Sequence, residues 1–140
     1  MKRFEPLTSL IPTLEAEETH GQWILDHEHA GTDDDPIQMP FVGYTVAEIE
    51  LVKAVYICDH NNPDLGSHDY VDVLEEYGLD DQEAFNNADV IQLDARCVLA
   101  MILYVIRADR FCEGTVKEYL DHGKLLEWAK RLREIDDMEG

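Results

Sequence analysis

The ten residues Cys97-Val98-Leu99-Ala100-Met101-Ile102-Leu103-Tyr104-Val105-Ile106 decide the fold class. This run is apolar on every side, so its periodicity fits a buried helix or a buried strand equally well. Its length and its leucine, methionine and alanine content favour the helix. We therefore predict a central helix over about Val90–Arg110, wrapped by the rest of the chain.

Helical patterns lie on both sides of this run. Thr45-Val46-Ala47-Glu48 has the pattern of a capping box, and the helix after it would bury Val46, Ile49, Val52, Val55 and Tyr56. Thr115-Val116-Lys117-Glu118 has the same pattern. The last helix presents Leu125, Trp128, Ala129, Leu132 and Ile135 on one face, and we expect its end, residues 136–140, to fray.

Shorter elements complete the predicted fold. Apolar spacing from Leu7 to Leu14 and from Tyr70 to Tyr77 indicates two helices, the second stopped by Gly78, and one further turn is expected at residues 82–85. Residues 22–44 are the least regular part, with a minor β-hairpin as one possibility. The predicted fold is an all-α domain of five to seven helices that spans residues 1–140.

The charge balance restricts the classes of partner that this protein can bind. Thirty-one acidic residues against eleven basic ones give a formal net charge of −20. Such a field repels nucleic acids and anionic membranes, so we expect neither as a direct partner. We expect a non-enzymatic interaction or accessory protein whose acidic surface binds a basic protein, in its sharpest form a nucleic-acid mimic. Adaptation to a saline habitat is a third explanation of the charge.

Cysteine and hydropathy patterns predict a cytoplasmic protein. Cys58, Cys97 and Cys112 are too few and odd in number for a disulfide framework, and their apolar neighbours suit buried free thiols. The first residues lack the apolar run of a signal peptide. The longest apolar run is about half the length that spans a bilayer.

Motifs for metals and nucleophilic catalysis are weak, so we predict no metal and no cofactor, and we favour a protein without enzymatic activity. Residues 59–72 fail the EF-hand pattern, because Pro63 stands where an oxygen ligand is needed. His27 and His29 would share one face of a strand, but no Cys-x-x-Cys or His-Glu-x-x-His accompanies them. Cys112 lies close to two arginines, yet it follows Phe111 in what we take to be a packed turn.

Those arginines, Arg107 and Arg110, stand three residues apart at the end of the predicted central helix. They could complement the helix dipole, bond the last carbonyls and pair with carboxylates such as Asp69 or Asp72. They could also form an anion clamp beside the helix that begins at Thr115. The second reading makes the protein a small anionic-ligand binder or an enzyme, which is our alternative function.

The segment Arg107-x-x-Arg110-Phe111-Cys112-x-Gly114, followed by a short helix, Gly123 and a leucine-rich last helix, resembles a bacterial family of small uncharacterised domains. The step Gly43-Tyr44 before the capped helix is similar to that family too. The resemblance implies a compact bacterial cytosolic domain. It supplies no activity and no catalytic residues.

Overall fold

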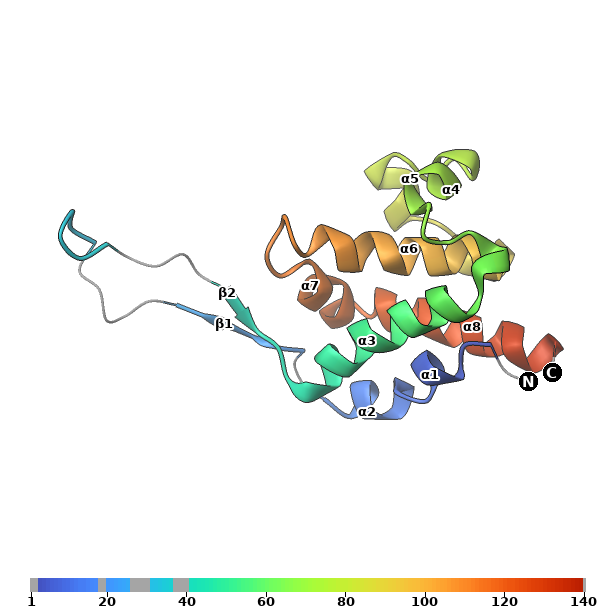
Figure 1. The fold of residues 1–140 in the computed structure, drawn as a ribbon, viewed down its shortest axis with the longest axis horizontal. Coiled ribbons are helices and arrows are strands. Elements are labelled where there is room, and N and C mark those ends of the chain that lie inside the picture. The colour runs from blue at the N-terminus through green and yellow to red at the C-terminus, as the bar shows by residue number, and fades with distance from the viewer. Residues whose placement is uncertain (1–2, 18–19, 26–30, 37–40, 140) are drawn as a thin grey trace.

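The structure is a computed structural model that describes residues 3–17, 20–25, 31–36 and 41–139. Within these ranges it is mostly helical, with seven helices of five residues or more, the single turn α1 and a two-stranded antiparallel sheet. The prediction of an all-α fold with a minor hairpin is confirmed. Figure 1 shows a helical body from which the hairpin projects as an arm.

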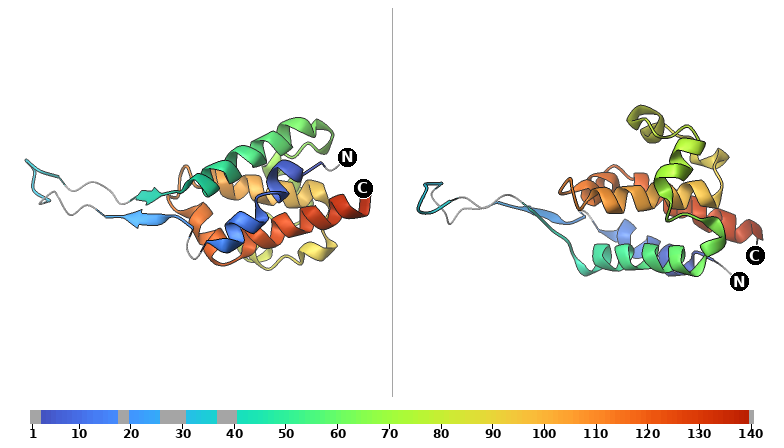
Figure 2. Two further views of the ribbon diagram at one scale, coloured as in Figure 1. Left: turned by 90° about the horizontal axis from the view of Figure 1, so that it is seen from below. Right: turned by 45° about the horizontal axis from the view of Figure 1, so that its top comes forward.

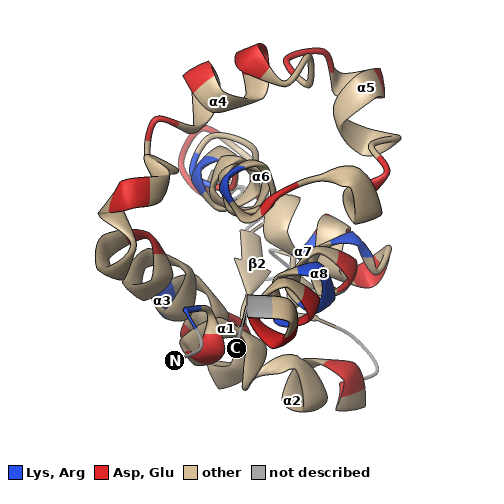
Figure 3. Ribbon diagram, turned by 90° about the vertical axis from the view of Figure 1, so that its right-hand side faces the viewer, with Lys and Arg blue, Asp and Glu red and all other residues tan. Residues whose placement is uncertain are grey.

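The predicted central helix is α6 (Ala95–Ala108). It begins later than expected because Asp94 is its N-cap and accepts a hydrogen bond from the amide of Cys97 at 3.0 Å. From Cys97 to Ile106 only Tyr104 is exposed. Helices α3 (Val46–Asn61), α4 (Tyr70–Glu76), α7 (Thr115–Asp121) and α8 (Lys124–Glu139) all pack against it. Figure 3 shows α6 in the middle of this ring of helices.

The first predicted helix is two helices, α1 (Glu5–Thr8) and α2 (Ile11–Ala16). The chain ends one helix at Ser9 and begins the next after Leu10. Pro12 then lies in the first turn of α2, where its missing N–H removes no intrahelical bond. The break lets Leu7, Ile11 and Leu14 all be buried, each 1% exposed, against α3 and α8.

The capping box at the start of α3 is confirmed, because the carboxylate of Glu48 accepts hydrogen bonds from the amide and the hydroxyl of Thr45. The predicted buried face is partly wrong. Val46 and Ile49 are 73% and 47% exposed, whereas the buried residues are Glu48, Leu51, Ala54, Val55 and Cys58. The helix carries apolar residues on two faces, and packing against α1 and α6 selects one of them.

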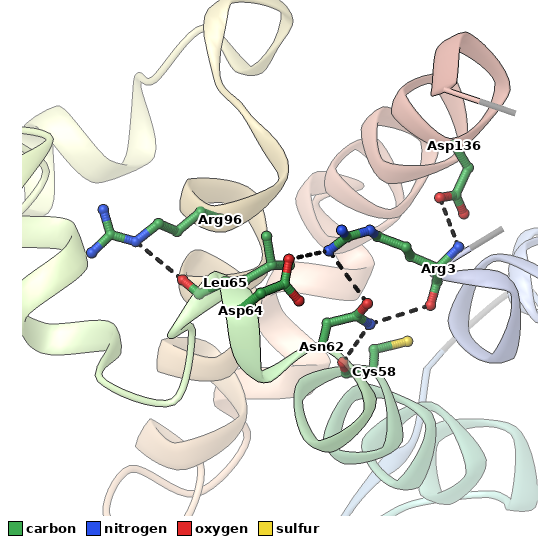
Figure 4. A network of polar contacts seen from close by, with 7 residues as sticks. All are labelled: Arg3, Cys58, Asn62, Asp64, Leu65, Arg96 and Asp136. Atoms are coloured by element: carbon green, nitrogen blue, oxygen red, sulfur yellow. Dashed lines mark hydrogen bonds and ion pairs between the residues drawn. The ribbon is translucent and has the colours of Figure 1, made fainter. Parts of the chain in front are cut away.

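The expected fraying at the C-terminus is wrong for the described residues, since α8 continues to Glu139. Asp136 is 3% exposed, and its two carboxylate oxygens accept hydrogen bonds from the amides of Arg3 and Phe4 at 3.0 and 2.9 Å. Figure 4 shows the Arg3 contact together with an ion pair from the Arg3 guanidinium to Asp64. The first described residues and the last helix therefore fasten each other.

Two short helices cover the upper side of α6. Helix α4 ends as predicted at Gly78, whose φ of +74° lies in the left-handed region that glycine adopts without strain. The predicted turn near residue 82 is α5 (Gln82–Asn86), and Asp81 caps it by accepting from the amide of Glu83 at 3.0 Å. In Figure 2 the two helices stand over α6, away from the other helices of the body.

The hairpin consists of β1 (Gln22–Ile24) and β2 (Phe41–Gly43), with Trp23 opposite Val42 and Ile24 opposite Phe41. Gly114 lies under its base, where an added Cβ would come within 2.6 Å of the Trp23 ring. The amide of Val42 also donates to the carboxylate of Glu113 at 2.8 Å. The segment 31–36 lies at the end of the arm far from the helices (Figure 1).

Replacing Asp136 with alanine tests the contact between the two ends of the chain. Asp136→Ala leaves two amides of residues 3 and 4 without acceptors, one of them buried, so the free energy of unfolding should fall by about 1–3 kcal/mol in urea denaturation. The control is Glu134→Ala in the same helix, which loses only an exposed ion pair with Arg131 and should change stability by less than about 1 kcal/mol. Equal effects of the two variants would contradict this role of Asp136.

Candidate functional site

A groove of about 670 Å³ lies between the α4–α5 segment and helices α6 and α7. It exists because α4 and α5 are too short to cover the whole length of α6. Its lining is contributed by five segments of the chain. The apolar and aromatic lining residues are Val71, Leu74, Leu79, Phe85, Tyr104, Ala108 and Tyr119.

Phe85 organises the aromatic side of the groove. This residue is 4% exposed, and its ring centroid lies 5.2 Å from that of Tyr104 and 5.5 Å from that of Trp128. The ring of Tyr119 contacts the rings of Phe85 and Trp128, with centroid distances of 6.2 and 5.6 Å. Such packed rings have few alternative arrangements. Tyr104, 43% exposed, presents part of its ring to solvent.

Asn86 connects α5 to the opposite wall. Its side-chain oxygen accepts a hydrogen bond from the Tyr119 hydroxyl at 2.7 Å, and its carbonyl oxygen accepts one from the Lys124 ammonium at 2.6 Å. Burial raises the pKa of Tyr119, and the neighbouring Glu118 carboxylate adds to the effect. The phenol is therefore neutral at physiological pH and remains a donor to Asn86.

The charged groups around the groove are mainly acidic. Asp80, Asp81 and Glu118 line it, against Lys124 and the exposed His122. The ammonium of Lys124 is already engaged by the Asn86 carbonyl. A ligand with an apolar part and a positive charge could pack against the aromatic floor of the groove, formed around Tyr104, and pair with the carboxylates.

Arg107 and Arg110, the residues singled out in the sequence, do not line this groove. Both are exposed, and within the described ranges neither side chain makes a hydrogen bond or ion pair with another residue. The expected pairing with Asp69 or Asp72 is therefore absent from the part of the chain that the structure describes. Whether the two arginines bind an anion stays a prediction.

The helix beside those arginines has its first amides already occupied. Asp109 accepts a hydrogen bond from the amide of Val116 at 3.1 Å and from the hydroxyl of Tyr44 at 2.9 Å. The Tyr44 oxygen in turn accepts from the amide of Lys117 at 3.2 Å. Burial first, and then the Asp109 carboxylate, raises the pKa of Tyr44, so this hydroxyl stays protonated. An anion would have to displace these groups.

Three further expectations for this region are wrong. The second capping box is not formed, because Gly114 is the N-cap of α7 and the Thr115 hydroxyl donates back to the carbonyl of Cys112 at 2.6 Å. Asp109 supplies the cap instead. Phe111 is 87% exposed and Cys112 is also exposed, so the turn after α6 is not packed as expected. Cys58 and Cys97 are buried as predicted.

No three His, Cys, Asp or Glu residues within the described ranges lie close enough together to hold a metal ion. His27 and His29 fall outside those ranges, so the prediction for them stays a prediction. Within the same ranges no helix has the length and hydropathy that crossing a membrane requires.

A cluster of polar side chains, apart from the groove, lies where the hairpin joins the helical body. The Thr45 hydroxyl is 3.3 Å from a carboxylate oxygen of Glu17, and it also donates to Glu48, which is 1% exposed. His20, 6% exposed, places its Nδ1 3.6 Å from the other Glu17 oxygen. Burial, followed by the nearby Glu48 carboxyl, raises the pKa of Glu17, against a smaller opposing effect of His20.

The raised pKa predicts the effect of removing this charge. A group whose pKa is raised by folding contributes stability below its ordinary pKa, here 4.5, and that contribution is lost as the pH rises through the raised value. Glu17→Gln should therefore raise Tm at pH ~7, and the gain should disappear at pH ~4. The matched control Glu15→Gln should give no gain at neutral pH, because a bond from Lys130 lowers the pKa of Glu15. A gain of Glu17→Gln that persists unchanged at pH ~4 would contradict the assignment.

Comparison with known proteins places the chain in a family. The family of unknown function DUF6508 matches residues 1–138. The chain belongs to this family. The match confirms that the chain resembles a family of unknown function over nearly its whole length. The bacterial origin and the Arg107–Gly114 motif stay predictions. No curated protein and no solved structure matches the chain.

Sequence reasoning missed the aromatic groove of this DUF6508 member. Phe85, Tyr104 and Tyr119 belong to three separate helices, and no local pattern joins them. One signal was present. Tyr104 is the only hydroxyl-bearing residue in the apolar run of α6, which marks the side of that helix that reaches solvent.

Proposed function

We propose that this protein is a non-enzymatic interaction domain that binds a basic, amphipathic segment of a partner protein in the groove between α4–α5 and α6–α7. The observation that carries the proposal is the combination of an aromatic floor with a carboxylate rim. Tyr104 lies in the floor of the groove, and its rim carries the carboxylates of Asp80, Asp81 and Glu118.

An amphipathic helix is the segment that best fits this chemistry. Its apolar face would bury side chains against the floor, as in other cases where a helix lies in a hydrophobic groove. Its flanking lysines or arginines would meet the rim carboxylates. The net charge of −20 adds a long-range attraction that accelerates encounter with a basic partner. The groove gives the contact a shape, which net charge alone lacks.

The other sequence hypotheses receive less support. An anionic ligand would meet the acidic rim of the groove, and Arg107 and Arg110 lie outside it. A nucleic-acid mimic needs its acidic residues gathered in a stripe, whereas Figure 3 shows them on helices all around the body. The proposal keeps a bacterial cytoplasm as the place of action, as the resemblance implies and as free cysteines suit.

A synthetic amphipathic helix of leucine and lysine tests the proposal. We expect fluorescence anisotropy of the labelled peptide to give a Kd in the range of about 1–100 μM, weakening as salt is raised. Tyr104→Ala removes a half-exposed ring from the floor, and Asp80→Lys and Glu118→Lys reverse rim charges. Each variant should weaken binding at least about tenfold, which corresponds to ~1.4 kcal/mol.

Glu50→Lys is the matched control, because it makes the same charge change at an exposed position of α3 outside the groove. It should weaken binding less than about twofold, through the global field alone. A scrambled peptide of the same composition controls for charge without an apolar face. If Glu50→Lys and Glu118→Lys weaken binding equally, or if the scrambled peptide binds as well, the groove is not the site.

A further inference from the structure

We propose that two copies of this chain associate through their β1–β2 arms, with the acidic segment 31–36 of each copy against the Arg107–Phe111 segment of the other. Of the described residues that form this surface, only Ala108 also lines the groove, and the proposal does not depend on what the groove binds. It starts from the apolar residues of the arm, defined as residues 22–25, 31–36 and 41–43.

Apolar side chains occupy both faces of the hairpin. Residues paired across two strands point to the same face, so Trp23 and Val42 share one face and Ile24 and Phe41 share the other. The first face lies on Gly114, where Val42 is 6% exposed and Trp23 is 44% exposed. On the second face Ile24 and Phe41 remain 43% and 48% exposed. A solvated face would carry polar residues at these positions.

The geometry of the arm gives a second reason. Its two strands have three residues each, and a two-stranded hairpin without further cover is marginally stable in water. The body contacts the base of the arm through Gly114 and Glu113. Face-to-face packing of another arm would cover Ile24 and Phe41.

Charge complementarity points to a second copy as the occupant. Asp33 and Asp34 are exposed at the far end of the arm. Arg107 and Arg110 are exposed where α6 ends, just before the loop that packs against the arm's base, and their side chains have no partner in the described ranges. Within one chain the two charged segments lie at opposite ends of the arm (Figure 1).

Two arms that lie antiparallel bring these segments together. The end of each arm then reaches the base of the other, and the same contact forms twice about a twofold axis. The arrangement closes on itself and gives a dimer rather than a filament. Phe111, 87% exposed between the arginines and the arm's base, would be covered in the same contact. The attraction between aspartates and arginines at the two ends counters the repulsion between two strongly acidic chains. Salt also screens that repulsion.

Paired charge reversals test this arrangement. One variant carries Asp33→Lys and Asp34→Lys, and the other carries Arg107→Glu and Arg110→Glu. All four positions are exposed, so both variants should keep the helical circular dichroism of the parent. In sedimentation analysis at protein concentrations up to roughly 100 μM, the parent should dimerise and each variant alone should be monomeric.

Mixing the two variants gives the decisive result. In a mixed pair each lysine end meets a glutamate base, and each aspartate end meets an arginine base, so both contacts become attractive again. We expect the equimolar mixture to dimerise as the parent does. A parent that stays monomeric, variants that dimerise alone, or a mixture that stays monomeric would each overturn the proposal. Ile24→Ser supplies an independent check, since it should weaken the parent dimer at least about tenfold without any change of charge.

Discussion

Burial of α6 on nearly every side is the constraint on which the rest of the structure depends. A helix that lacks a polar face is stable in water only if other elements surround it. Each large apolar side chain that α6 buries contributes about 1.5–3 kcal/mol. Four helices supply the cover, and two of them, α3 and α8, also hold the first turns of the chain. The carboxylate of Asp136 then closes this lower layer by binding two backbone amides.

The groove is a consequence of the same constraint. On the upper side α6 is covered by α4 and α5, which have seven and five residues. Phe85 fills the centre of the contact, but helices of this length leave the ring of Tyr104 partly in solvent. The hydrogen bonds of Asn86 hold α5 at a fixed place over this opening. A fold built to bury one helix thus leaves a preformed aromatic surface.

Acidity and shape have separate roles in this protein. The high negative charge excludes polyanions and favours basic partners, but it is spread over the whole body (Figure 3). Specific contacts therefore depend on places where apolar surface and charge coincide. The groove combines aromatic rings with carboxylates, and the arm combines an uncovered apolar face with an acidic end. The exposed arginine pair at the end of α6 is a basic counterpart to the exposed aspartates at the arm's end.

The sequence alone determined those features that depend on neighbours a few residues apart. Length and composition identified α6, and helix periodicity identified α8. The Thr45–Glu48 spacing identified the start of α3, and Gly78 identified the end of α4. Only the tertiary structure decided which of two apolar faces α3 buries, that Asp109 rather than Thr115 caps α7, and that Asp136 is buried instead of frayed. It also decided that Phe111 is exposed and that three distant aromatic rings meet. Each of these outcomes depends on contacts beyond a local pattern, such as the amides that Asp136 binds more than a hundred residues away.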